Sequence, residues 1–124
     1  MNTTKSSYID LGPLKEEVEG NMIICKMLIE SFITDIDEYA AIMNAELKIS
    51  NLPTLFQVAH KIIPSIRIFN IVKLEPIIIE LETYLREEDD LESIRNHIGS
   101  SLVIFYQVKT ELQNELNLID DAAV

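Results

Sequence analysis

The sequence contains few residues that break helices or cross-link a chain. Its 124 residues include three glycines, four prolines and a single cysteine, Cys25. One cysteine can form neither an intramolecular disulfide nor a zinc cluster. Because the apolar residues also recur every three or four positions throughout the chain, the pattern predicts an all-α fold. Cys25 itself falls on an apolar stripe, which favours a small core residue over a reactive thiol.

Long apolar runs are also missing. No stretch reaches the length of about 18 uncharged apolar residues that is needed to span a bilayer. The polar start, Met1–Ser7, lacks the apolar core of a signal peptide. The length fits one domain, and a composition of 48% hydrophobic and 25% charged residues is typical of globular proteins. We therefore expect one cytoplasmic domain over residues 1–124, without membrane insertion and with residues 1–7 and 119–124 flexible.

Basic residues are scarce, and they are unevenly distributed. The net charge of −11 argues against a nucleic-acid partner, because such a surface would be repelled by phosphates. Residues 47–74, however, contain four basic residues and no Asp or Glu, so this segment carries +4 while the rest of the chain carries −15. The excess of basic residues in this segment either arose by chance on an ordinary solvated surface or forms a patch that binds an acidic surface of a partner.

The apolar spacing predicts a short helical turn and four long helices. Proline or a capping side chain marks several of the expected starts, as in Ser50–Pro53. The predicted helices cover approximately residues 14–18, 22–47, 52–69, 74–85 and 91–118. Since connections of about three to five residues join neighbouring helices in antiparallel order, we expect an up-down-up-down four-helix bundle with a short N-terminal helix.

Most catalytic motifs are absent from the sequence. It has no glycine-rich phosphate loop, no His-Glu-x-x-His, no paired cysteines and no nucleophile elbow. A di-iron bundle needs a glutamate three residues before each histidine, and Gln57 and Ile94 occupy those positions before His60 and His97. We therefore predict no metal site, and we expect His97 to be a surface or boundary histidine without a functional role.

His60 lies in a helical stretch whose apolar residues face the opposite way. The predicted buried stripe comprises Leu55, Val58, Ala59, Ile62, Ile66 and Phe69. At about 100° per residue, His60 falls about 140° from the middle of this stripe, so the imidazole is predicted to face water. The only charged residues in residues 55–70 are Lys61 and Arg67, and both are basic.

Four neighbours of His60 on the same helix are candidates for docking a partner. Phe56 and Gln57 precede His60 by one turn, and Ile63 and Pro64 follow it by one turn. Pro64 has no N–H to donate to the carbonyl of His60, so the helix is expected to bend there. From the spacing alone, an ordinary surface histidine on a kinked bundle helix stays an equal alternative to a reactive one.

The motif around His60 reads Ala59-His60-Lys61-Ile62-Ile63-Pro64-Ser65, and the chain continues with Ile66–Asn70 and Leu74–Glu82. These segments resemble the histidine phosphotransfer (HPt) domain family, which typically reads Ala-His-x-Leu-Lys-Gly-Ser before a helix turn and a helix ending in Leu-Glu. The similarity covers nearly the whole chain. Ile63 and Pro64 depart from the family pattern, since they replace its lysine and its glycine.

The resemblance implies a phosphocarrier rather than an enzyme. His60 would accept a phosphoryl group from the aspartyl phosphate of a receiver domain, such as that of a hybrid sensor histidine kinase, and would pass it to another receiver. Lys61 or Arg67 would support the phosphoryl charge in place of the missing lysine. The partner receiver would supply Mg²⁺, so no cofactor of its own is expected, and the chain would be a monomer. The alternative is a helical-bundle adaptor that binds a receiver or another signalling partner without phosphotransfer.

Overall fold

The fold has helices and turns but no strand in residues 7–88 and 90–123, which are the part of the chain that the computed structural model describes. The helices are α1 (Gly12–Glu17), α2 (Met22–Lys48), α3 (Leu52–Ile68), α4 (Glu75–Glu87) and α5 (Leu91–Ala123). The predicted all-α class is therefore confirmed. The expected flexible end 1–7 lies almost wholly outside the described residues, as does Val124.

Short polar side chains cap the starts of α2, α3 and α5, and the cap of α3 lies in the predicted start Ser50–Pro53. The Asn21 side chain accepts hydrogen bonds from two backbone N–H groups of the first turn of α2, and Asn51 does the same for one N–H of α3. Asp90 caps α5 by accepting from the N–H and the hydroxyl of Ser93, and these bonds hold the pKa of Asp90 below its usual value. Asn70, in the turn between α3 and α4, has a φ of 55°, a left-handed conformation that asparagine tolerates.

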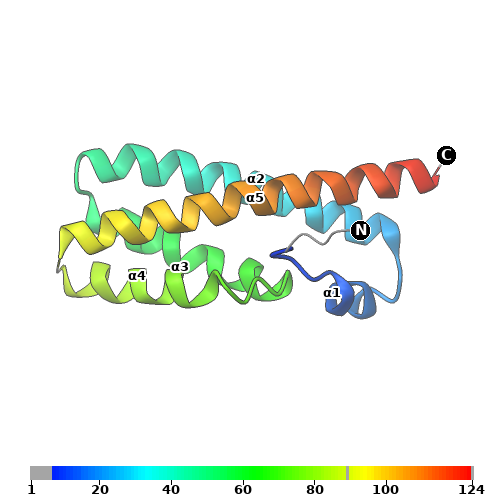
Figure 1. Ribbon diagram of the computed structural model, residues 1–124, viewed down its shortest axis with the longest axis horizontal. Helices are drawn as coiled ribbons and strands as arrows, with labels where there is room; N and C mark the ends of the chain where they lie inside the picture. The colour runs from blue at the N-terminus through cyan, green and yellow to red at the C-terminus, as the bar shows by residue number, and fades with distance from the viewer. Residues whose placement is uncertain (1–6, 89, 124) are drawn as a thin grey trace.

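Four of the helices pack in a ring. α2 contacts α3 and α5, and α4 contacts α3 and α5, while α1 contacts α2 (Figure 1). The helices differ in length, because α2 and α5 contain 27 and 33 residues whereas α3 and α4 contain 17 and 13. The longer pair extends past α3 and α4, and α1 lies beside this extension (Figure 1).

The core of the bundle is built around aromatic rings. Phe32 of α2 stacks on Phe69 at a centroid distance of 4.6 Å, and the Tyr39 ring lies 4.7 Å from that of Phe105. Leu, Ile and Met side chains fill the space around these rings, and Cys25 is a fully buried member of the same cluster. Burial raises the pKa of the Cys25 thiol, which fits the predicted role as a small core residue.

A buried hydrogen bond links the two long helices. The Tyr39 hydroxyl and the Ser101 Oγ are 2.7 Å apart, and Ser101 also donates to the carbonyl of Ile98. Burial raises the pKa of Tyr39 far above its usual range, so the phenol stays protonated. Neighbouring Gly99 has open space where a Cβ would lie, so Ser101, not Gly99, makes the helix contact in this segment.

The described part of the N-terminal segment is fastened to α5 by one carboxylate. Glu111 accepts hydrogen bonds from the Ser7 hydroxyl and from the backbone N–H groups of Tyr8 and Ile9. At the other end of the chain, α5 continues through residues 119–123, which the sequence suggested would be flexible. None of the helices in the described residues is both long enough and apolar enough to cross a membrane.

Replacing Tyr39 by Phe is expected to lower the free energy of unfolding by about 1 kcal/mol, because one buried hydrogen bond is lost. Chemical denaturation monitored by circular dichroism measures this change. Tyr106→Phe is the matched control. Tyr106 lies on α5, one of the two helices that the bond joins, but its side chain is exposed, so its substitution should leave stability unchanged. Equal stability of the Tyr39→Phe variant and the parent chain would show that the bond contributes nothing.

Candidate functional site

His60 lies on the solvent side of α3, as predicted. Its side chain is 70% exposed, whereas the opposite face of the helix is buried. The buried residues of α3 are Leu55, Ala59, Ile62, Ile63 and Ile66, and Val58 is half-buried. α3 therefore presents an exposed imidazole on a helix that is held firmly from the other side.

The His60 ring is held in place by a buried carboxylate from α4. Its Nδ1 lies 2.6 Å from Oε2 of Glu82, and Glu82 is only 7% exposed. Glu82 is the only charged residue in the buried part of the described chain. A carboxylate accepts hydrogen bonds, so His60 Nδ1 must donate, and the neutral ring then carries its lone pair on Nε2.

The fixed tautomer determines what the site can do chemically. The nitrogen with the free lone pair, Nε2, belongs to a side chain that is largely open to solvent. The unprotonated nitrogen of a neutral imidazole is a competent nucleophile. When Nε2 forms a bond, the ring gains a positive charge, and a carboxylate hydrogen-bonded to Nδ1 stabilises that charge. The pair His60–Glu82 is therefore suited to accept a group on Nε2.

An aromatic ring and a guanidinium lie next to this pair. The Phe56 ring is nearly parallel to the His60 ring, with an interplanar angle of 6° and a centroid distance of 6.0 Å. The Arg86 guanidinium lies 5.5 Å from the centroid of Phe56. Phe56, Gln57 and Arg86 line a shallow open groove between the start of α3 and the end of α4. Arg86 thus brings a cation to the neighbourhood of His60 from a second helix.

Three contacts define the register of α3 against α4. His60 pairs with Glu82. Phe56, four residues before His60, contacts Arg86, which lies four residues after Glu82. Arg67, seven residues after His60, pairs with Glu75, seven residues before Glu82, at 2.9 Å. Each step forward on α3 is matched by an equal step back on α4. These two helices are therefore antiparallel, and a single register produces all three contacts.

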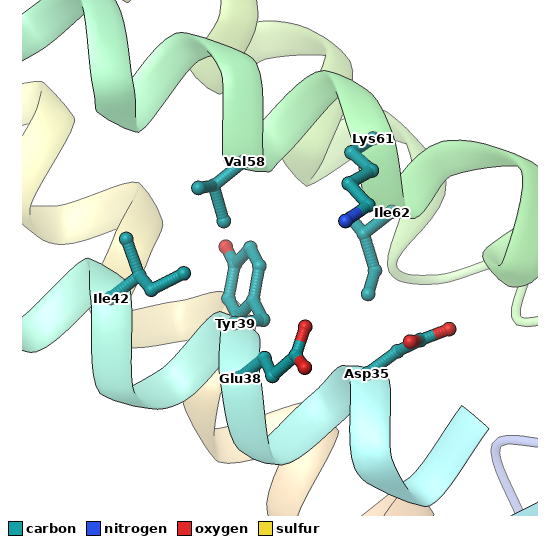
Figure 2. Close-up of a pocket in the computed structure, with 7 residues that line it drawn as sticks. All are labelled: Asp35, Glu38, Tyr39, Ile42, Val58, Lys61 and Ile62. Carbon is teal, nitrogen blue, oxygen red and sulfur yellow. The ribbon is translucent and has the colours of Figure 1, made fainter. Parts of the chain in front are cut away.

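The two predicted phosphate-supporting residues do not gather around His60. Arg67 lies two turns along α3, and its Nε donates to Glu75. Lys61 faces α2 instead of α4: together with Ile62 it lines a pocket of about 90 Å³, opposite Asp35 and Glu38 (Figure 2). Arg86, which the sequence did not single out, lies over the Phe56 ring beside His60.

Of the four predicted docking residues, three reach the surface. Gln57 and Pro64 are exposed and Phe56 is half-buried. Ile63 is only 7% exposed, so the expectation that it borders the imidazole with accessible surface is wrong. The reason is that α3 packs against α4 as well as α2, which widens the buried face of the helix to include Ile63.

His97 is more firmly bonded than expected. Its Nδ1 lies 2.8 Å from the carbonyl oxygen of Ser93, and its Nε2 lies 2.9 Å from Oε1 of Glu80. The ring also contacts Tyr84 at a centroid distance of 5.1 Å. His97 therefore links α4 to α5, and both of its nitrogens are engaged, unlike those of His60.

Potential metal ligands do not cluster in the described residues: no group of three or more His, Cys, Asp or Glu side chains could hold an ion there. Comparisons of the chain with protein-family models, with curated proteins and with solved structures give no match. The function of the chain is therefore inferred from the residues around His60.

Glu82→Gln is expected to change the tautomer of His60, because an amide accepts a hydrogen bond more weakly than a carboxylate and can also donate one. Nitrogen-15 chemical shifts of the imidazole, measured by NMR above the pH at which the ring is protonated, report which nitrogen carries the proton. The parent chain should show the proton on Nδ1, and the variant should show more of it on Nε2. Glu80→Gln, which alters the partner of His97, should leave the His60 signals unchanged; the same tautomer in the parent and in Glu82→Gln would contradict the assignment.

Proposed function

We propose that this chain is a phosphocarrier of the histidine phosphotransfer type, which accepts a phosphoryl group on His60 from the aspartyl phosphate of a receiver domain and passes it to a second receiver. The observation that carries the proposal is the 2.6 Å contact of His60 Nδ1 with the buried carboxylate of Glu82 on an otherwise exposed ring. This arrangement leaves Nε2 both nucleophilic and accessible to another protein.

The transfer step balances without a further reactant. The lone pair on Nε2 of His60 attacks the phosphorus in line, and the bond between phosphorus and the aspartyl oxygen breaks, with its electron pair leaving on the carboxylate. No proton needs to move. The ring becomes cationic, and Glu82, which accepts the Nδ1 proton in a hydrogen bond, stabilises that charge. Return of the phosphoryl group to a receiver is the same step in reverse.

The phosphoryl charge is met by Arg86 and, from the partner, by the magnesium ion that the receiver supplies. Arg86 lies over Phe56, which in turn stacks beside His60, so a short movement of its long side chain would bring the guanidinium toward a group on Nε2. Lys61 faces α2, and Arg67 lies two turns farther along the His60 face of α3, where it pairs with Glu75. Both contribute to the basic surface that attracts the acidic rim of a receiver. The chain itself needs no cofactor.

The architecture that goes with this function is an up-down-up-down four-helix bundle with a short N-terminal helix. Ion pairs support opposite directions for α2 and α5, because Lys26 pairs with Asp120 near one end and Asp37 with Lys109 farther along. The contacts of His60 and Arg67 support the same for α3 and α4. In such a bundle one exposed histidine can be offered to several receivers in turn, and the carrier works as a cytoplasmic monomer.

A helical adaptor that binds a receiver without chemistry is the second candidate. The observation that favours it is the replacement of the family's lysine by Ile63, which is buried, together with the pairing of Arg67 to Glu75. Binding of a receiver by the parent chain in the absence of any phosphotransfer would establish this alternative.

Incubation with a phosphorylated receiver is expected to label the parent chain but not His60→Gln, because the nucleophilic nitrogen is gone. The label should be lost in acid, as a bond between phosphorus and nitrogen is. His97→Gln is the matched control and should be labelled like the parent, since both nitrogens of His97 are engaged in hydrogen bonds. Circular dichroism of both variants checks that the helices are intact, and a label that survives in His60→Gln would refute the mechanism.

Charge substitutions separate the roles of the three cations. Arg86→Gln is expected to slow phosphotransfer by about tenfold or more, less than the roughly 10²–10³-fold loss seen when a preorganised charge-stabilising donor is removed, because Arg86 must first move toward the phosphoryl group. Lys61→Glu and Arg67→Glu should instead weaken receiver binding, and the loss should shrink as salt is added. Arg95→Gln, on exposed α5 surface, is the control. Identical transfer rates for Arg86→Gln and the control would remove Arg86 from the site.

A further inference from the structure

A cluster of exposed apolar side chains lies on the first turns of α2. Ile23 is 75% exposed and Met27 is 62% exposed, and Ile24 beside them is also largely accessible. At about 100° per residue these three side chains fall within an arc of about 100° on one face of the helix. Scattered single apolar residues are ordinary on a protein surface, whereas neighbouring ones on one helix face are a candidate contact surface for another molecule.

This apolar face is distant from the histidine site. Lys61, the residue after His60, faces Glu38 of α2 across a small pocket (Figure 2). Met27 precedes Glu38 by 11 residues and Ile23 precedes it by 15. At 1.5 Å per residue, the apolar face lies roughly 16–22 Å farther along α2. A partner on this face would therefore leave His60 open.

The end of the bundle that carries this face is strongly acidic. Residues 7–30 and 111–121 together contain nine acidic and two basic residues, a net charge of −7. Both lysines are engaged within the chain, Lys15 with Glu115 at 3.8 Å and Lys26 with Asp120 at 2.8 Å. Lys73 of the turn between α3 and α4 adds one further cation beside these segments, 5.9 Å from the centroid of the Tyr8 ring. The carboxylates still outnumber the cations, so the surface around the apolar face has a negative potential.

We infer that the face formed by Ile23, Ile24 and Met27 is a second docking surface, which binds a basic amphipathic helix of another protein. The apolar side of such a helix would cover these three side chains. Its lysines or arginines would meet Glu30, three residues after Met27, and Glu19, in the turn before α2. An apolar centre surrounded by acidic residues fits a partner that has an apolar face flanked by basic residues.

Charge argues against the other possible occupants. A second copy of this chain would bring another −7 to the same place, and like charges facing each other across an interface oppose association. The anionic headgroups of a membrane would be repelled in the same way. A cationic helix, in contrast, gains from both the apolar contact and the charge.

The test uses a fluorescent synthetic helix with leucine on one face and lysine on the other, and measures its binding to the full chain by anisotropy. The parent should bind this peptide, more weakly at high salt. Ile23→Ser combined with Met27→Ser should raise the Kd by about tenfold or more, the loss typical of removing a central apolar anchor. Glu30→Lys, which leaves the apolar face intact, should also weaken binding.

Val103→Ser combined with Tyr106→Ser is the matched control, because it removes exposed apolar side chains from the outer face of α5, where Val103 is 69% exposed. This variant should bind the peptide as the parent does, and so should His60→Gln, since the surface is independent of phosphotransfer. Equal losses in the two double variants, or equal binding of a peptide with glutamate in place of lysine, would overturn the inference. A dimer of the parent in sedimentation that Ile23→Ser and Met27→Ser abolish would assign the face to a second copy instead.

Discussion

The contact between His60 and Glu82 is the constraint on which the site and the α3–α4 pair depend. A carboxylate as buried as that of Glu82 is costly unless a hydrogen-bond donor compensates it, and in the described residues the only such donor is His60 Nδ1. The register of α3 against α4 that brings His60 opposite Glu82 is therefore the one that satisfies the buried charge. Any slip by one residue would leave the carboxylate without its partner.

That constraint has a second effect, on the histidine. An exposed imidazole on a helix surface would otherwise sample several rotamers and both neutral tautomers. Tied by one nitrogen to a carboxylate inside the bundle, the ring keeps one orientation while its other nitrogen stays accessible. The same register places Phe56 and Arg86 one turn away on the two helices, so the neighbourhood of the ring follows from the packing of α3 and α4.

Local features were readable from the sequence, and features that depend on the register were not. The helix start at Ser50–Pro53, the proline in the first turn of α4 and the exposure of His60 follow from short-range rules, and the structure agrees with them. Glu82 was missed although a signal existed. It lies four residues after Ile78 and directly after Leu81, so it borders the apolar stripe of its helix, where a charged residue needs an explanation. Ile63 was misplaced because the predicted buried stripe was too narrow: α3 contacts both α2 and α4, and this widens its buried face.

The Glu111 carboxylate, which receives the Ser7 hydroxyl and two backbone N–H groups, joins residues that are 104 positions apart in the chain. Contacts between successive helices are closer in sequence and can form early, whereas this one closes a loop of almost the whole chain. During synthesis on the ribosome, Ser7, Tyr8 and Ile9 emerge long before Glu111 and must wait for most of α5 before they can dock. An early part of the chain would thus be among the last to reach its final place.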